Sequence, residues 1–109
     1  MADEGVLRIT VLEAHLTHNT ETFGKMDPYV KLSCRNGDDH WKSGVMSNAG
    51  KNPVWDHDNV WDLEVHYLGD ELTYVVMDEE VFKDDFVGEG KTKLGALAVH
   101  GGFDEWFDL

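Results

Sequence analysis

Apolar and polar residues alternate along most of this chain, and this period of two limits its fold more than any other feature. The stretch "LRITV" (residues 7–11) shows the pattern, and "VKLSC" (30–34) and "WDLEV" (61–65) repeat it. Such alternation indicates a β-strand with one face on a core and the other in water. Turn residues such as Asn36-Gly37 separate the runs, so the sequence predicts consecutive strands that pair antiparallel.

The predicted strands have the spacing of a two-sheet sandwich. They cover residues 6–14, 29–35, 40–46, 58–66, 71–78, 86–93 and 105–109, and residues 93–99 allow a single helical turn. Without a long helical pattern, strands at this spacing favour an all-β antiparallel sandwich. A chain of 109 residues has room for one such core and is too short for two, so we expect a single domain over residues 1–109.

The chain is strongly acidic, which narrows the range of partners. With 9 Lys+Arg against 22 Asp+Glu, its net charge is −13 at pH 7. Such a surface repels nucleic acid, and no basic stripe is visible, so we expect no nucleic-acid partner. An anionic membrane is also repelled unless a cation intervenes. One cysteine (Cys34), no evident signal peptide and no membrane-length apolar run together predict a cytoplasmic protein.

Carboxylates gather in two connections between the predicted strands. The first connection, residues 15–28, carries Glu21 and Asp27, and the second is the acidic run "DEEVFKDD" from Asp78 to Asp85. Loops that leave the same end of an antiparallel sandwich cluster in space, so the two connections can face each other. Unit charges about 4 Å apart repel by roughly 1 kcal/mol in water, and more strongly near a protein surface. Either both loops are simply solvated, or a hard cation with oxygen ligands, such as calcium, lies between them.

Several motifs, taken in order, resemble those of a known family. The stretches "LRITVLEA", "GKMDPYVKL", "NPVW", "ELTYVVMDEE" and "KDDFVGEGKTKLGAL" are similar in order and spacing to those of the C2 domain, a calcium- and lipid-binding module. The resemblance covers nearly the whole chain and is nearest to small, free-standing plant C2 proteins described as elicitor-responsive or phloem proteins. It implies an eight-stranded antiparallel β-sandwich of the phospholipase-type strand order. It also implies calcium held between loops 15–28 and 77–87, at one end of the sandwich.

The same resemblance implies which residues hold the calcium. The metal ligands of the family fall on five acids of this chain: Glu21, Asp27, Asp78, Glu80 and Asp85. Two of the five are glutamate where the family usually has aspartate, and the second acidic loop is one residue shorter than usual. Glu79 and Asp84 are therefore additional candidate ligands.

Three apolar residues stand among these acids: Phe23, Val81 and Phe82. One hypothesis is that they fold back and anchor the loops on the sandwich. The other is that they enter a bilayer once calcium has cancelled the local charge, as exposed apolar residues at a binding surface do.

These features together predict a binding module and not an enzyme. No nucleophile paired with a base and no glycine-rich phosphate loop is visible in the sequence. The first hypothesis is a module that binds anionic phospholipid membranes when calcium is present, and so is peripheral to the membrane. The rival hypothesis is a calcium-independent protein-interaction or scaffold module within a larger assembly.

The end of the chain carries one more expectation. In the phospholipase-type order a further strand would follow "DEWFDL" and lie beside the first strand, residues 6–14. We therefore expect the final strand to be missing. In that case the chain is either a truncated piece or completes its sheet with a strand from a partner or from a second copy, because an open strand edge invites pairing.

Overall fold

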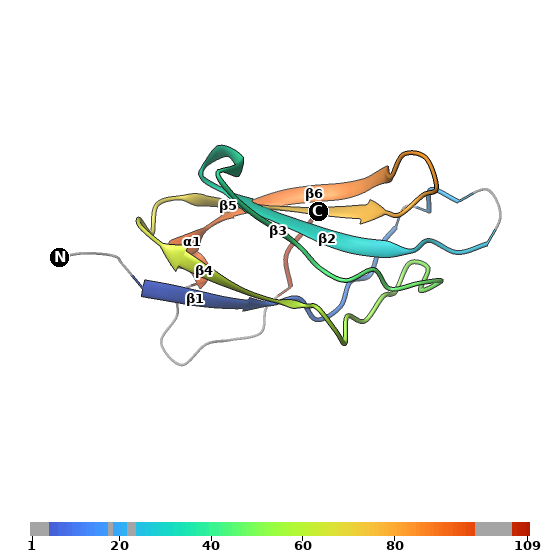
Figure 1. Ribbon diagram of the computed structural model, residues 1–109, viewed down its shortest axis with the longest axis horizontal. Helices are drawn as coiled ribbons and strands as arrows, with labels where there is room; N and C mark the ends of the chain where they lie inside the picture. Colours follow the sequence, from blue (N-terminus) through green and yellow to red (C-terminus); the bar gives the residue numbers. More distant parts are fainter. Residues whose placement is uncertain (1–4, 18, 22–23, 98–105) are drawn as a thin grey trace.

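The computed structural model of the protein describes residues 5–17, 19–21, 24–97 and 106–109. Within them, two antiparallel sheets pack together, which confirms the predicted all-β sandwich (Figure 1). The larger sheet has the order β3-β2-β5-β6, with β2 (Pro28–Cys34), β3 (Asp39–Lys42), β5 (Glu71–Asp78) and β6 (Asp85–Lys93). The smaller sheet pairs β1 (Gly5–Thr10) with β4 (Val60–Val65). Two short helical turns, η1 (Arg35–Gly37) and α1 (Leu94–Leu97), complete the described elements.

The alternation seen in the sequence sets which side chains form the core. In β2 the apolar residues Val30 and Leu32 are buried, whereas Lys31 between them is exposed. From the opposite sheet, Leu63 and Val65 of β4 join the same hydrophobic cluster. Fully burying one such side chain contributes about 1.5–3 kcal/mol, so the two sheets hold each other through this shared apolar layer.

Most of the predicted strands have the expected bounds, but two end early. The strands expected at 29–35, 58–66, 71–78 and 86–93 are present within two residues at each end. The strand expected at 40–46 stops at Lys42, although the amides of Ser43 and Met46 still donate to the carbonyls of Val30 and Pro28 in β2, at 2.8 and 3.0 Å. The first strand stops at Thr10 rather than at 14, and an isolated bridge between Glu13 and Val54 follows it.

The C-terminal segment differs from the prediction of a strand at 105–109. Residues 106–109 belong to no strand, and residue 105 lies outside the described part of the chain. Side chains rather than a backbone ladder hold this segment: the Tyr74 hydroxyl donates to the Asp108 carbonyl at 2.7 Å, and the Phe107 ring lies 6.0 Å from that of Tyr74. The segment crosses close to Gly90, where an added Cβ would lie 2.5 Å from the Asp108 carbonyl oxygen. The predicted helical turn is confirmed as α1, with Leu94 fully buried.

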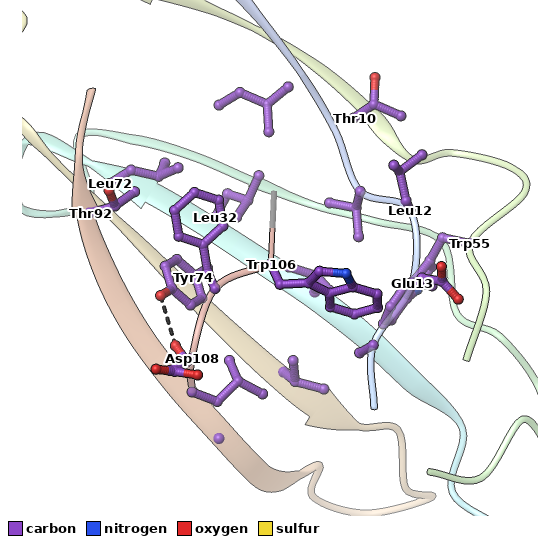
Figure 2. Close-up of a pocket in the computed structure, with 18 of the residues that line it drawn as sticks. Thr10, Leu12, Glu13, Leu32, Trp55, Leu72, Tyr74, Thr92, Trp106 and Asp108 are labelled. Atoms are coloured by element: carbon purple, nitrogen blue, oxygen red, sulfur yellow. Dashed lines mark hydrogen bonds between the residues drawn. The ribbon is translucent and has the colours of Figure 1, made fainter. Parts of the chain in front are cut away.

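A cavity of about 680 Å³ separates the segment that follows β1 from the inner face of the larger sheet (Figure 2). Leu12 lines one side, Leu32 and Tyr74 line another, and Trp106 points into it from the C-terminal segment. Among the described residues β1 pairs with β4 alone, so no strand of this part of the chain occupies its other edge. The supply of a strand at this edge by a partner or a second copy stays a prediction.

Candidate metal centre

Two loops from different parts of the chain meet at one end of the sandwich (Figure 1). One loop precedes β2, and the other, residues 79–84, joins β5 to β6. The Asp27 amide donates to the Asp78 carboxylate at 2.8 Å, and the Glu79 amide donates to the Asp27 carbonyl at 3.0 Å. The structure therefore brings together the two acidic connections that the sequence places some 50 residues apart.

Asp78 lies at the centre of this junction. It is the last residue of β5, and its side chain is fully buried. One carboxylate oxygen accepts the Asp27 amide, and the other accepts the Thr20 hydroxyl at 2.5 Å. Burial alone would raise the pKa of Asp78, but these hydrogen bonds outweigh it and hold the pKa below its usual value. A buried, ionised carboxylate is thus built into the junction of the two loops.

Three carboxylates converge on one point. Oxygen atoms of Glu21, Asp78 and Glu80 all lie within 4.8 Å of one another. Hydrogen bonding to Glu80, and then to Asp78, raises the pKa of Glu21 to about 8, and repulsion from these two neighbouring carboxylates adds a smaller contribution. Without a cation, the protein therefore relieves the repulsion by keeping a proton on Glu21 at neutral pH. A divalent cation can relieve it by bridging all three groups, and oxygen-only ligands suit calcium.

The other predicted ligands lie near this cluster but outside it. The Asp27 carboxylate accepts the Asn48 amide at 2.5 Å, although its own backbone is bonded to Asp78. Asp85 is exposed at the start of β6, where it is the register partner of Asp78 in the ladder. Glu79 is also exposed. The structure thus gathers three of the five predicted ligands and leaves two beside them.

Asp84, an additional candidate ligand, has both carboxylate oxygens engaged by the protein. One oxygen accepts the Glu80 amide at 2.9 Å, and the other accepts the hydroxyl of Tyr29. The Glu80 amide, followed by the Tyr29 hydroxyl, lowers the pKa of Asp84. On its side, burial and then the bond to Asp84 raise the pKa of Tyr29 to about 12, so the tyrosine stays protonated and donates.

The apolar residues of the second loop point into solvent. Val81 is 90% exposed and Phe82 is 100% exposed, so neither anchors the loop on the sandwich. Phe23 of the first loop lies outside the described residues. Whether Val81 and Phe82 enter a membrane stays a prediction, but their exposure leaves them free to do so.

Three partners in this region were missed in the sequence. Thr20 and Tyr29 donate hydroxyl groups to Asp78 and Asp84, and Asn48 donates its amide to Asp27. None has a local signal in the sequence, because each contacts its acid across at least 21 positions of the chain. Thr20 alone stands beside a predicted ligand, Glu21.

Comparison with known proteins gives consistent matches. The profile of the C2 domain family matches residues 5–109. Human extended synaptotagmin-3 is 34% identical over 110 residues, a match that covers 96% of this chain and 12% of that protein. Elicitor-responsive protein 3 of Oryza sativa subsp. japonica is 33% identical over 99 residues, covering 90% of this chain and 66% of that protein. The chain thus spans only a small part of the length of the extended synaptotagmin.

A solved structure gives the same fold. The calcium-bound C2A and C2B domains of extended synaptotagmin 2 match with a TM-score of 0.78 and 32% sequence identity, over 94% of this chain and 39% of that one. Within the residues that the structure describes, no helix is both long and apolar enough to cross a membrane.

Proposed function

The chain belongs to the C2 domain family, and from this premise we propose that it is a module that binds anionic phospholipid membranes in response to calcium. The observation that carries the proposal is the convergence of Glu21, Asp78 and Glu80 beside a loop whose apolar tip is exposed. We propose that residues 1–109 act together as one binding domain and not as an enzyme.

Glu21, Asp78 and Glu80 are the ligands that the geometry supports best. Asp27 and Asp85 remain proposed ligands, because the first is hydrogen-bonded to Asp78 and the second is its register partner. Calcium takes about six to eight oxygen ligands, so lipid phosphate and water have room to complete the shell. The donor set, made of carboxylates alone, fits calcium and not a metal that prefers nitrogen or sulfur.

The charge of the chain explains why a cation would control membrane binding. At −13 the protein is repelled by an anionic surface. Calcium at the loops cancels local charge, and Val81 and Phe82, with Phe23 as a further proposed tip, then reach the bilayer. Burying one such side chain contributes about 1.5–3 kcal/mol, which is enough for reversible docking. We propose a cytoplasmic protein that becomes a peripheral membrane protein when calcium rises.

We predict that the protein sediments with vesicles of phosphatidylcholine and phosphatidylserine in calcium and stays in the supernatant in chelator. Replacing Phe82 by serine should weaken the calcium-dependent binding by about tenfold or more, because the bilayer then loses one aromatic side chain that it would bury. The matched control is Val6→Ser, which changes an apolar residue, 70% exposed, near the start of β1 and should leave sedimentation unchanged. Figure 1 shows that β1 starts at the end of the sandwich opposite the two loops. Equal sedimentation in calcium and in chelator would exclude the proposed function.

Calcium binding should also release a proton. Because the pKa of Glu21 is raised to about 8, the folded protein holds a proton there at pH 7 that the ion must displace. Calcium affinity should therefore rise as pH increases from about 6 to 9, with release of roughly one proton at pH 7. In the ion-free protein the same group favours folding at low pH and loses this contribution as pH rises through 8.

Calorimetry at pH 7 in two buffers of different ionisation enthalpy measures the proton directly. The control is the same titration near pH 9.5, where the release should disappear because Glu21 is already ionised. A pH-independent affinity with no proton release would show that Glu21 is not in contact with the ion.

A second candidate function is protein binding without calcium. The observation in its favour is the edge of β1 that no described strand occupies, beside an apolar cavity of about 680 Å³. A strand from a partner or from a second copy would add to this edge by main-chain hydrogen bonds. The vesicle experiment distinguishes the two candidate functions, because protein binding without calcium predicts no difference in sedimentation between calcium and chelator.

A further inference from the structure

Asp84 connects three segments that surround the metal centre. Its carboxylate accepts the Tyr29 hydroxyl from β2 and the Glu80 amide from the second residue of the loop. Asp84 itself is the last residue of that loop, directly before β6. The ring of Tyr29 is held in turn by the sheet: it is buried, and the Lys42 ammonium of β3 lies 5.5 Å from its centre. One carboxylate thus connects the loop to the rigid sheet.

This connection determines where Glu80 lies. Two successive amides of the loop are bonded, that of Glu79 to the Asp27 carbonyl and that of Glu80 to Asp84. Hydrogen bonds therefore fix the backbone at both Glu79 and Glu80. The Glu80 carboxylate lies in the cluster with Glu21 and Asp78. Residues 81–83 form bends, and the hydrogen bond from the Glu80 amide to the Asp84 carboxylate joins the two ends of this stretch, which leaves Val81 and Phe82 exposed to solvent.

We propose that Asp84 is a positioning residue and not a ligand. It holds the loop in the shape that places Glu80 against Asp78, so the loop does not have to be ordered when calcium binds. Preorganisation of this kind strengthens calcium binding, because the loop loses its conformational entropy when the protein folds and not when calcium binds. The inference deepens the proposed function and rests on calcium being held by Glu21, Asp78 and Glu80.

The key variant is Tyr29→Phe, which leaves the carboxylates of Glu21, Asp78 and Glu80 unchanged. Phenylalanine keeps the buried ring under Lys42 and removes only the hydroxyl that Asp84 accepts. If Asp84 positions the loop, Tyr29→Phe weakens calcium affinity by roughly tenfold, the scale of a lost hydrogen bond to a charged group. If Asp84 is itself a ligand, Tyr29→Phe removes a hydrogen bond that competes for the Asp84 carboxylate. Calcium affinity is then unchanged or higher. The two roles therefore predict opposite results.

A double-mutant cycle completes the test. Asp84→Asn should weaken calcium binding about as much as Tyr29→Phe, and the two together should cost little more, because they break one connection. Saturating calcium should still restore vesicle binding in each variant, since the ligands remain. The matched controls are Tyr67→Phe, at an exposed tyrosine, and Asp38→Asn, at an exposed acid in the turn at the far end of β2, and both should bind calcium as the unmodified protein does.

Amide exchange in chelator provides a readout that does not depend on the ion. In Tyr29→Phe the Glu80 amide should exchange faster, while the amides of the β2–β5 ladder keep their protection. The unmodified protein is titrated first: if it binds no calcium, the proposed function fails. If it binds calcium but Tyr29→Phe binds as tightly, or the Glu80 amide exchanges no faster, the positioning role of Asp84 is wrong and the proposed function stands.

Discussion

The variant Asp78→Asn is expected to lose calcium binding almost completely, with affinity reduced by about a hundredfold or more. Asp78 is the buried member of the cluster, and one of its carboxylate oxygens lies within 4.8 Å of an oxygen of Glu21 and an oxygen of Glu80. Asparagine has nearly the same shape but supplies no negative charge to the ion. A carboxylate attracts a divalent cation several-fold more strongly in a partly desolvated site than in water. Removing the buried charge of Asp78 should therefore lower calcium affinity more than removing an exposed charge would.

The same variant should keep its fold, which makes the result interpretable. The asparagine oxygen can still accept the Asp27 amide, and its NH2 group can donate to the Thr20 hydroxyl, because a hydroxyl both donates and accepts. The matched control is Glu79→Gln, which removes one charge from the exposed neighbour and should reduce affinity only a few-fold. Calorimetric titration measures both, and calcium binding by Asp78→Asn at the parent affinity would refute the assignment of the site.

Calcium is expected to raise the midpoint of thermal unfolding by about 10 °C. A ligand present at 100 times its dissociation constant stabilises the native state by about 2.7 kcal/mol when it binds only that state. For a domain of about 100 residues, 1 kcal/mol corresponds to roughly 4 °C or more. The ion would bind where oxygen atoms of Glu21, Asp78 and Glu80 lie within 4.8 Å of one another in the folded chain, so it should bind the native state alone.

Unfolding curves recorded in millimolar calcium and in chelator test this expectation. Asp78→Asn serves as the control, since its two curves should coincide while those of the unmodified protein separate. Coincident curves for the unmodified protein would show that no ion binds the native state at these concentrations.

The class of fold followed from the sequence because alternation is a local property. Each strand shows its buried face through side chains two residues apart, as in Val30 and Leu32, and the turns between strands carry their own residue types. The two acidic loops could also be located, since both flank predicted strands. The C2 resemblance then indicated Glu21, Asp78 and Glu80, which the structure brings within 4.8 Å.

What only the tertiary structure decided is how each carboxylate is used. Asp84 and Asp85 are adjacent and chemically identical in the sequence, yet one is bonded to Tyr29 and the Glu80 amide, whereas the other is exposed in the β5–β6 ladder. Likewise, the sequence predicts a strand at 105–109, but residues 106–109 are held by side-chain contacts, among them the hydrogen bond from the Tyr74 hydroxyl to the Asp108 carbonyl, 34 positions away. A hydrogen bond between residues far apart in the sequence produces no periodic pattern along the chain. The alternation of apolar and polar residues therefore determined the sheets, whereas only the tertiary structure determined which carboxylate does what within the site.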